Sequence, residues 1–159
     1  MSLEIMRRVR FCAGHRLLNH GGKCESLHGH NYQAEFYVTG DQVDDVGRLI
    51  DFAQLKKLFK GWIDDNWDHA MLLWDQDRET IAAVQAIPGQ RLYPLPFNPS
   101  AENLAKYLLE HVCPPLLKEA GVRATKVIIW ETQEACAIAH VDANEAIVSR
   151  SSFLESADC

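Results

Sequence analysis

Residues 11–32 read FCAGHRLLNHGGKCESLHGHNY and contain four of the seven histidines of the chain. Apolar residues alternate with polar ones on both sides of this stretch, a period of two that is typical of strands. Its middle is polar and rich in Gly and Asn, which break regular structure. The pattern predicts strands over residues 3–11 and 28–39, joined by a long polar loop over residues 12–27. Two consecutive strands of this kind favour an antiparallel pair.

The rest of the chain alternates between helical and strand-like patterns. Apolar spacing of three and four residues predicts helices, with Asp51 and Ser100 as N-caps. Pro114 and Pro115 are expected to interrupt the last helix. The fold class is therefore α+β, with a four-stranded antiparallel sheet and helices on one face. The further elements expected are helices at 52–66, 77–86 and 100–113, an extended segment at 91–97, and strands at 124–131 and 135–141.

Length and composition indicate a single soluble domain. The 159 residues fit one domain, which we place at residues 1–143, and residues 144–159 are predicted to be a partly disordered extension. A net charge of −6 argues against a nucleic-acid binder, and no apolar run is long enough for a membrane span. Five cysteines without paired spacing, and an N-terminus unlike a signal peptide, predict a reducing cytoplasm.

His28 and His30 are the strongest candidates for metal ligands. Residues two apart on a strand point to the same face, so both imidazoles can reach one ion. A third ligand from the paired strand would give the three-histidine set of a catalytic zinc site. His15 is the better third candidate and His20 is its competitor. Taken alone, however, the HGH sequence is equally consistent with a polar strand start.

Four further residues are candidates for chemistry: Cys24, Asp68, His69 and Glu131. Cys24 follows Lys23 near the expected cation, which favours a thiolate that acts as a base, although metal ligation is the rival role. Asp68 can orient His69 for general acid–base catalysis if the two side chains face each other; a solvated loop pair is the alternative. Glu131 ends an apolar strand, where a carboxylate could bind two N–H donors of a flat heterocycle or pair with a basic residue.

These residues resemble a known family, that of 6-pyruvoyltetrahydropterin synthase and 6-carboxytetrahydropterin synthase. The matching segments occur in the family's order over about residues 5 to 140. They are Phe11–His15, Cys24–Tyr32, Gly47–Phe52, Asp68-His69, Pro99–Leu104 and Glu131-Thr132.

The resemblance implies a fold, a site and an assembly. The expected fold is the tunnelling fold, with ββααββ subunits that join their sheets into a barrel, usually as a homohexamer of two trimers with active sites at subunit interfaces. The implied zinc ligands are His15, His28 and His30, and the implied catalytic residues are Cys24, Asp68 and His69. Glu131 is implied to anchor the pterin ring, helped by backbone groups of Ser100 and Ala101.

The spacing between Cys24 and the HGH motif separates branches of the family. Three residues lie between them here, which resembles the bacterial 6-carboxytetrahydropterin synthases of queuosine (7-deazapurine) biosynthesis. That branch implies a zinc-dependent lyase that converts 7,8-dihydroneopterin triphosphate to 6-carboxy-5,6,7,8-tetrahydropterin, acetaldehyde and triphosphate. One alternative is a 6-pyruvoyltetrahydropterin synthase, which eliminates triphosphate without cleaving a carbon–carbon bond. A more distant alternative is a zinc-binding module without catalysis.

The chain also departs from the family pattern. Gly14, Trp67 and Ser100 stand where Ala, Leu and Thr are common. The segment from Trp74 to Asn98 is longer than in compact members, and the sequence does not indicate its role. None of these departures removes a chemical group from the expected site.

Overall fold

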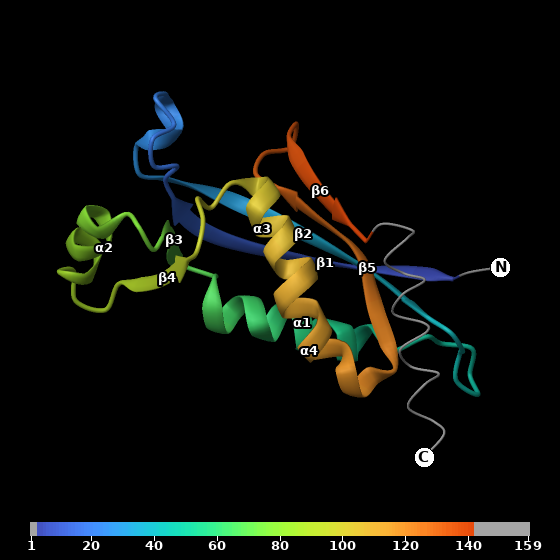
Figure 1. The fold of residues 1–159 in the computed structure, drawn as a ribbon. Coiled ribbons are helices and arrows are strands. Elements are labelled where there is room, and N and C mark those ends of the chain that lie inside the picture. The colour runs from blue at the N-terminus through green and yellow to red at the C-terminus, as the bar shows by residue number, and fades with distance from the viewer. Residues whose placement is uncertain (1–2, 142–159) are drawn as a thin grey trace, which may run out of the picture.

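Residues 3–141, the part of the chain that the computed structural model describes, form a curled mixed sheet with helices packed against it (Figure 1). The strand order is β4-β3-β1-β2-β5-β6. Antiparallel pairing joins β1 to β2, β2 to β5 and β5 to β6, whereas β3 pairs in parallel with β1 and β4. The strands are β1 (Glu4–His15), β2 (His28–Gly40), β3 (Ala70–Trp74), β4 (Arg91–Leu95), β5 (Val122–Trp130) and β6 (Cys136–His140).

The helices begin at the caps that the sequence indicates. The Asp51 carboxylate accepts from the Ala53 N–H at 2.7 Å, and the Ser100 hydroxyl accepts from the Asn103 N–H at 3.3 Å. None of the helices within residues 3–141 is both long and apolar enough to cross a bilayer. The extension predicted for residues 144–159 lies outside the described residues. The α-helices are α1 (Phe52–Asn66), α2 (Arg78–Gln85), α3 (Ala101–Tyr107) and α4 (Cys113–Leu117).

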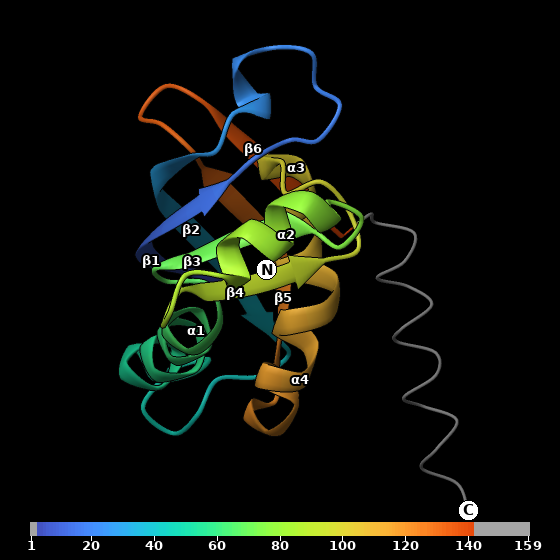
Figure 2. The same cartoon turned by 90° about the vertical axis from the view of Figure 1, so that its left-hand side faces the viewer.

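The expected four-stranded antiparallel sheet is wrong, because the described residues form a six-stranded mixed sheet. The four expected strands are present and pair as expected. The sheet continues beyond β1 with β3 and β4, which flank α2 in the chain and lie beside it (Figures 1 and 2). The β3 sequence AMLLW is a short apolar run without alternation, so its period could not reveal a strand.

Two boundaries also differ from expectation. Strand β1 continues to His15 rather than ending at residue 11, because Cys12 to His15 stay paired with β2. Pro114 and Pro115 do not interrupt the last helix. A π-helical turn over Leu108–Val112 joins α3 to α4, and both prolines lie in the first turn of α4, where the missing amide hydrogen is tolerated.

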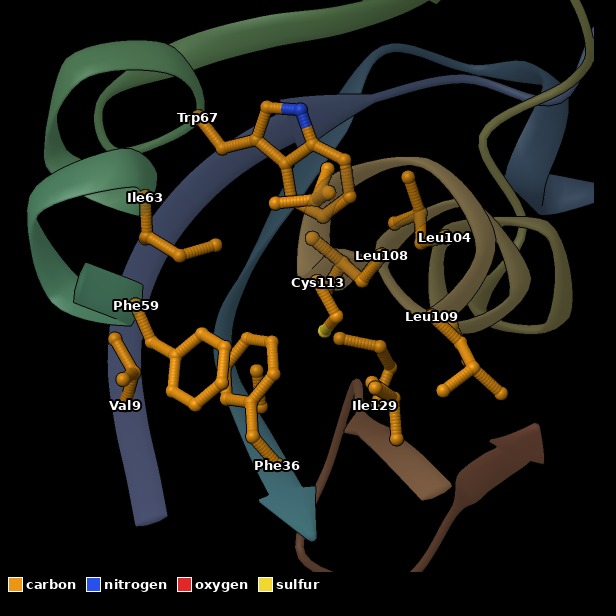
Figure 3. Close-up of a cluster of buried hydrophobic side chains, with 14 of the residues drawn as sticks. Val9, Phe36, Phe59, Ile63, Trp67, Leu104, Leu108, Leu109, Cys113 and Ile129 are labelled. Carbon is orange, nitrogen blue, oxygen red and sulfur yellow. The ribbon is translucent and has the colours of Figure 1, made fainter. Parts of the chain in front are cut away.

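The apolar core lies between the sheet and helices α1, α3 and α4 (Figure 3). Alternate residues of β1 and β2, including Val9 and Phe36, face these helices. Phe36 stacks on Phe59 of α1 with ring centroids 4.1 Å apart. Because His15, His28 and His30 continue the same alternation, they emerge on the helix-covered face at one end of the core.

Candidate active site

Three imidazoles meet where β1 and β2 pair. In the antiparallel register His15 lies opposite His28, and His30 lies opposite Ala13, two residues further along. One ring nitrogen from each histidine lies within 4.8 Å of the others. Gly29 lies between the two β2 histidines, and a Cβ there would come within 2.9 Å of the Ala13 carbonyl oxygen. The glycine therefore allows the close strand approach that brings the rings together.

Backbone carbonyls set the orientation of two of these rings. His15 Nδ1 lies 2.8 Å from the Pro99 oxygen, and His28 Nδ1 lies 2.7 Å from the Ser26 oxygen. A carbonyl oxygen only accepts, so each Nδ1 carries the proton and each Nε2 presents a lone pair. These two Nε2 atoms are 3.0 Å apart, with no proton between them. A cation bound by both lone pairs would remove this repulsion, so the donor set fits a metal such as zinc.

Burial keeps the site in the form that binds metal. It lowers the pKa of His15 from 6.5 to about 4, even though the Pro99 carbonyl acts in the opposite direction. Burial also lowers the pKa of His30. Both imidazoles are therefore neutral at pH 7, as metal ligation requires.

Glu131 lies beside the histidines. Its carboxylate comes within 3.9 Å of His15 Nε2, and because His15 is neutral this contact is not an ion pair at pH 7. The side chain is 27% exposed, so it is less buried than the apolar strand before it suggested. The group is thus accessible to a ligand in the adjoining cleft.

The Tyr32 hydroxyl lies within electrostatic range of both Glu131 and Cys24. Burial raises the pKa of this hydroxyl, and the nearby Glu131 and Cys24 raise it further. The hydroxyl also lies 3.2 Å from His15 Nδ1. Cys24 is half-buried in a short 3₁₀ turn, Lys23–Glu25, and its sulfur is not part of the histidine group. The thiol therefore lies within electrostatic range of Tyr32 but outside the ligand set found among residues 3–141.

Asp68 and His69 face each other. His69 Nδ1 lies 3.0 Å from the Asp68 carboxylate, whose other oxygen accepts from the Cys12 N–H at 2.9 Å. Burial raises the pKa of Asp68, but the Cys12 N–H and the His69 ring outweigh it and leave the pKa lowered. The ionised carboxylate favours a proton on Nδ1, so Nε2 of the exposed His69 ring is free to accept one.

The unexpected strand β3 brings this pair to the site. Because β3 runs parallel to β1, Ala70 lies opposite Ala13, and the His69 N–H donates to the Cys12 oxygen at 2.6 Å. His69 has a positive φ of 57°, a left-handed conformation that turns the chain from α1 into β3. The Asp–His pair is therefore fixed one strand away from the histidines.

A cleft of about 930 Å³ adjoins these groups. Its lining includes His30, Tyr32, Asp68, Glu131 and Arg10. A second cleft, of about 620 Å³, includes His28, His30 and His69 in its lining. The Asp–His pair and the histidine cluster thus open onto shared surface hollows.

Ser100 caps α3 and Ala101 begins it, directly after Pro99, whose oxygen contacts His15. Four of the expected site residues line neither cleft: His15, Cys24, Ser100 and Ala101. The rival ligand His20 is exposed in the loop and is not part of the histidine group.

Sequence reasoning missed three groups that support the site. Tyr32 shares the face of His28 and His30, and that periodicity could have identified it. Arg91 donates to the Asp68 and Asp65 carbonyls at 2.6 Å each, across 23 and 26 residues, so no local pattern reveals it. The Pro99 contact uses a backbone carbonyl, which has no side-chain signature.

Comparisons with known proteins identify a family for the chain. The family model of 6-pyruvoyl tetrahydropterin synthase matches residues 4–141. A Rickettsia bellii protein named 6-carboxy-5,6,7,8-tetrahydropterin synthase is 37% identical over 130 residues, covering 82% of this chain and 94% of its own length.

Solved structures share the fold. An uncharacterized protein from Wolinella succinogenes matches with a TM-score of 0.75 at 20% identity, covering 89% of this chain and 99% of its own. The 6-pyruvoyl tetrahydropterin synthase of Plasmodium vivax matches with a TM-score of 0.67 at 22% identity, with the same coverage. Since the family model spans nearly all of the described residues, the chain belongs to the 6-pyruvoyl tetrahydropterin synthase family.

Proposed function

We propose that this chain is a zinc-dependent 6-carboxytetrahydropterin synthase. The reaction is the conversion of 7,8-dihydroneopterin triphosphate to 6-carboxy-5,6,7,8-tetrahydropterin, acetaldehyde and triphosphate. The observation that carries the proposal is that the Nε2 atoms of His15 and His28 lie 3.0 Å apart, one strand away from the oriented Asp68–His69 pair. The name of the Rickettsia bellii relative supports the carboxy product.

His15, His28 and His30 would hold the zinc ion, since their nitrogens converge and two are oriented by carbonyls. A bound zinc ion supplies Lewis-acid polarisation of oxygen atoms on the pterin side chain. Three histidine ligands, rather than four protein ligands, are what a catalytic rather than a structural zinc site would use.

The remaining roles belong to Glu131 and the Asp68–His69 pair, which line the two clefts, and to Cys24 in the adjoining loop. Glu131 binds the N–H edge of the pterin ring with its accessible carboxylate. Cys24, as a thiolate, takes a proton from the substrate side chain. His69, oriented by Asp68, moves protons through Nε2 as triphosphate leaves and the carbon–carbon bond breaks.

The assembly proposed is a homohexamer of two trimers, in which the sheets of neighbouring subunits form a barrel. The outer strands β4 and β6 each pair with one neighbour within residues 3–141, and such edges favour pairing with another subunit. Backbone groups of Ser100 and Ala101 would help Glu131 to hold the pterin ring. The enzyme would act on a small molecule in the cytoplasm, in queuosine biosynthesis.

The second candidate is 6-pyruvoyltetrahydropterin formation, favoured by the family model itself. Incubation of zinc-loaded protein with 7,8-dihydroneopterin triphosphate, followed by mass spectrometry of the pterins, separates the two. A 6-carboxy product supports the proposal, whereas a 6-pyruvoyl product alone contradicts it. Cys24→Ala should abolish most turnover while zinc stays bound, and Cys136→Ala is the matched control.

A non-catalytic zinc module is the remaining alternative. It requires Cys24 as a fourth ligand, and this residue is not part of the histidine group. Such a module would bind zinc without binding the pterin substrate, so absence of any product together with tight zinc binding would favour it.

A further inference from the structure

The loop that carries Cys24, residues 16–27, makes its longest-range contacts with the segment from Trp74 to Asn98. Within the loop, the Leu17 N–H donates to the Cys24 oxygen at 2.8 Å. This hydrogen bond ties the backbone of Cys24 to that of Leu17. Both ends of the 74–98 segment hold this part of the loop. They do so by different contacts.

The first contact is an ion pair at Arg16, the residue that follows His15. Arg16 Nη1 donates to the Thr80 hydroxyl at 2.8 Å, and Arg16 Nε lies 3.3 Å from the Asp77 carboxylate. Asp77 and Thr80 are 4% and 5% exposed, so this close charge contact lies in a nearly dry environment, although Arg16 Nε and Asp77 Oδ2 do not form a hydrogen bond with each other. Arg16 also reaches Glu25, the residue after Cys24, at 3.9 Å. Its guanidinium therefore links α2 to the 3₁₀ turn of the cysteine.

The second contact is a two-way hydrogen bond at Asn98. The Leu18 N–H donates to the Asn98 side-chain oxygen at 2.8 Å, and the Asn98 amide donates back to the Leu18 oxygen at 2.9 Å. Asn103 of α3 in turn donates to the Asn98 backbone oxygen at 2.9 Å. Because both backbone groups of Leu18 are satisfied by one side chain, the loop is fixed at this point in position and direction.

We infer that Asp77 and Asn98 are positioning residues, which hold the loop of Cys24 beside the histidine cluster through Arg16 and Leu18. This inference rests on the proposed function for the role of Cys24. It assigns a task to the 74–98 segment, which otherwise contributes no group to the histidine cluster. Val84, Ile87 and Gln90 of this segment line the second cleft, whereas Asp77 and Asn98 line neither cleft and contact the loop.

Two variants of the full chain test the inference, each loaded with zinc. Asp77→Asn keeps an oxygen that can cap α2 at the Thr80 N–H but removes the charge that faces Arg16. Asn98→Ala removes both bonds to Leu18. Asp75→Asn is the matched control, because Asp75 is an exposed acid two residues from Asp77.

We expect hydrogen exchange in residues 16–27 to be at least about fivefold faster in both variants, with residues 52–66 unchanged. Alkylation of Cys24, measured by mass spectrometry relative to Cys136, should also change by at least about threefold. The kcat should fall by about tenfold or more, while KM and zinc content stay close to wild type. The Asp75→Asn control should match wild type in all of these measurements.

Unchanged loop exchange and unchanged Cys24 alkylation in both variants would overturn the inference. A uniform rise in exchange that includes residues 52–66 would do the same, since it would show a general loss of stability. If wild-type protein makes no pterin product, the proposed function fails, and loop exchange and alkylation still decide whether the two residues position Cys24.

Discussion

The neighbours of each histidine determine what its ring can do. Pro99 and Ser26 offer carbonyl oxygens to His15 and His28, and Asp68 offers a carboxylate to His69. In all three cases the contact is at Nδ1, so Nε2 is the nitrogen left for a metal or a proton. His15 and His69 differ in burial, because His15 is 1% exposed and the side chain of His69 is 74% exposed.

Loss of one ligand should remove the metal. We predict that His28→Ala binds less than about a tenth of the zinc that wild type retains, because two imidazoles do not complete a stable zinc shell. The measurement is zinc per chain after dialysis against a weak chelator. His20→Ala is the control and should keep the wild-type amount, so equal zinc in both variants would refute the ligand assignment.

The buried neutral state of His15 makes stability depend on pH. Its pKa is about 4 in the folded chain and 6.5 as a free side chain, so the unfolded chain binds more protons between these values. Stability contributed by the neutral ring is therefore lost as pH falls below 6.5. We predict that zinc-free protein loses about 2 kcal/mol of unfolding free energy through this residue between pH 7 and pH 5.

Urea unfolding at the two pH values measures this loss. In His15→Gln the pH-dependent loss should be smaller by about the same amount. A variant with the wild-type pH dependence would show that His15 is not the group responsible.

At the scale of elements, the helix face of the sheet places the core and the site on one surface. Phe59 of α1 is 1% exposed and stacks on Phe36, whereas Phe52 on the same helix is 53% exposed. On β1 and β2, the buried core residues and the three histidines belong to one alternating pattern.

Phe59→Ala should cost about 3–5 kcal/mol of unfolding free energy, because it leaves a cavity in the core. Phe52→Ala, the same change on the exposed side of α1, should cost less than about 1 kcal/mol. Chemical denaturation of both variants gives the comparison, and similar costs would contradict the observed packing.

The elements that sequence patterns predicted are those with a clear period or cap. The helix at 52–66 was predicted to the residue, because Asp51 caps it and its apolar residues recur at helical spacing. The strand at 28–39 was predicted to within one residue for the same kind of reason. Strand β3 was missed, since AMLLW is apolar throughout and its partners are distant in the chain.

The residues of the candidate site also divide into those that a local sequence pattern reveals and those that it does not. His15, His28 and His30 could be grouped from strand spacing, because register carries residues 13 apart onto one face. The contact between Asp68 and His69 depends on the turn into β3, and the contacts of Asn98 and Arg91 join residues 23 to 80 apart. Such contacts depend on tertiary structure and leave no local pattern.

At the scale of the whole molecule, the sheet has open edges and the site opens outward. His69 is largely exposed, and Cys24, Ser100 and Ala101 line neither cleft of their own chain. These features favour completion of the site by neighbouring subunits. We predict a mass in solution six times that of one chain, which light scattering after size-exclusion chromatography measures. A monomer that is fully active would contradict the assembly.

The central claim is that carbon–carbon cleavage accompanies loss of triphosphate. The most direct measurement counts acetaldehyde and triphosphate released by zinc-loaded protein from 7,8-dihydroneopterin triphosphate. The account predicts one acetaldehyde for each triphosphate, with 6-carboxy-5,6,7,8-tetrahydropterin as the pterin product. Triphosphate released without acetaldehyde would contradict it.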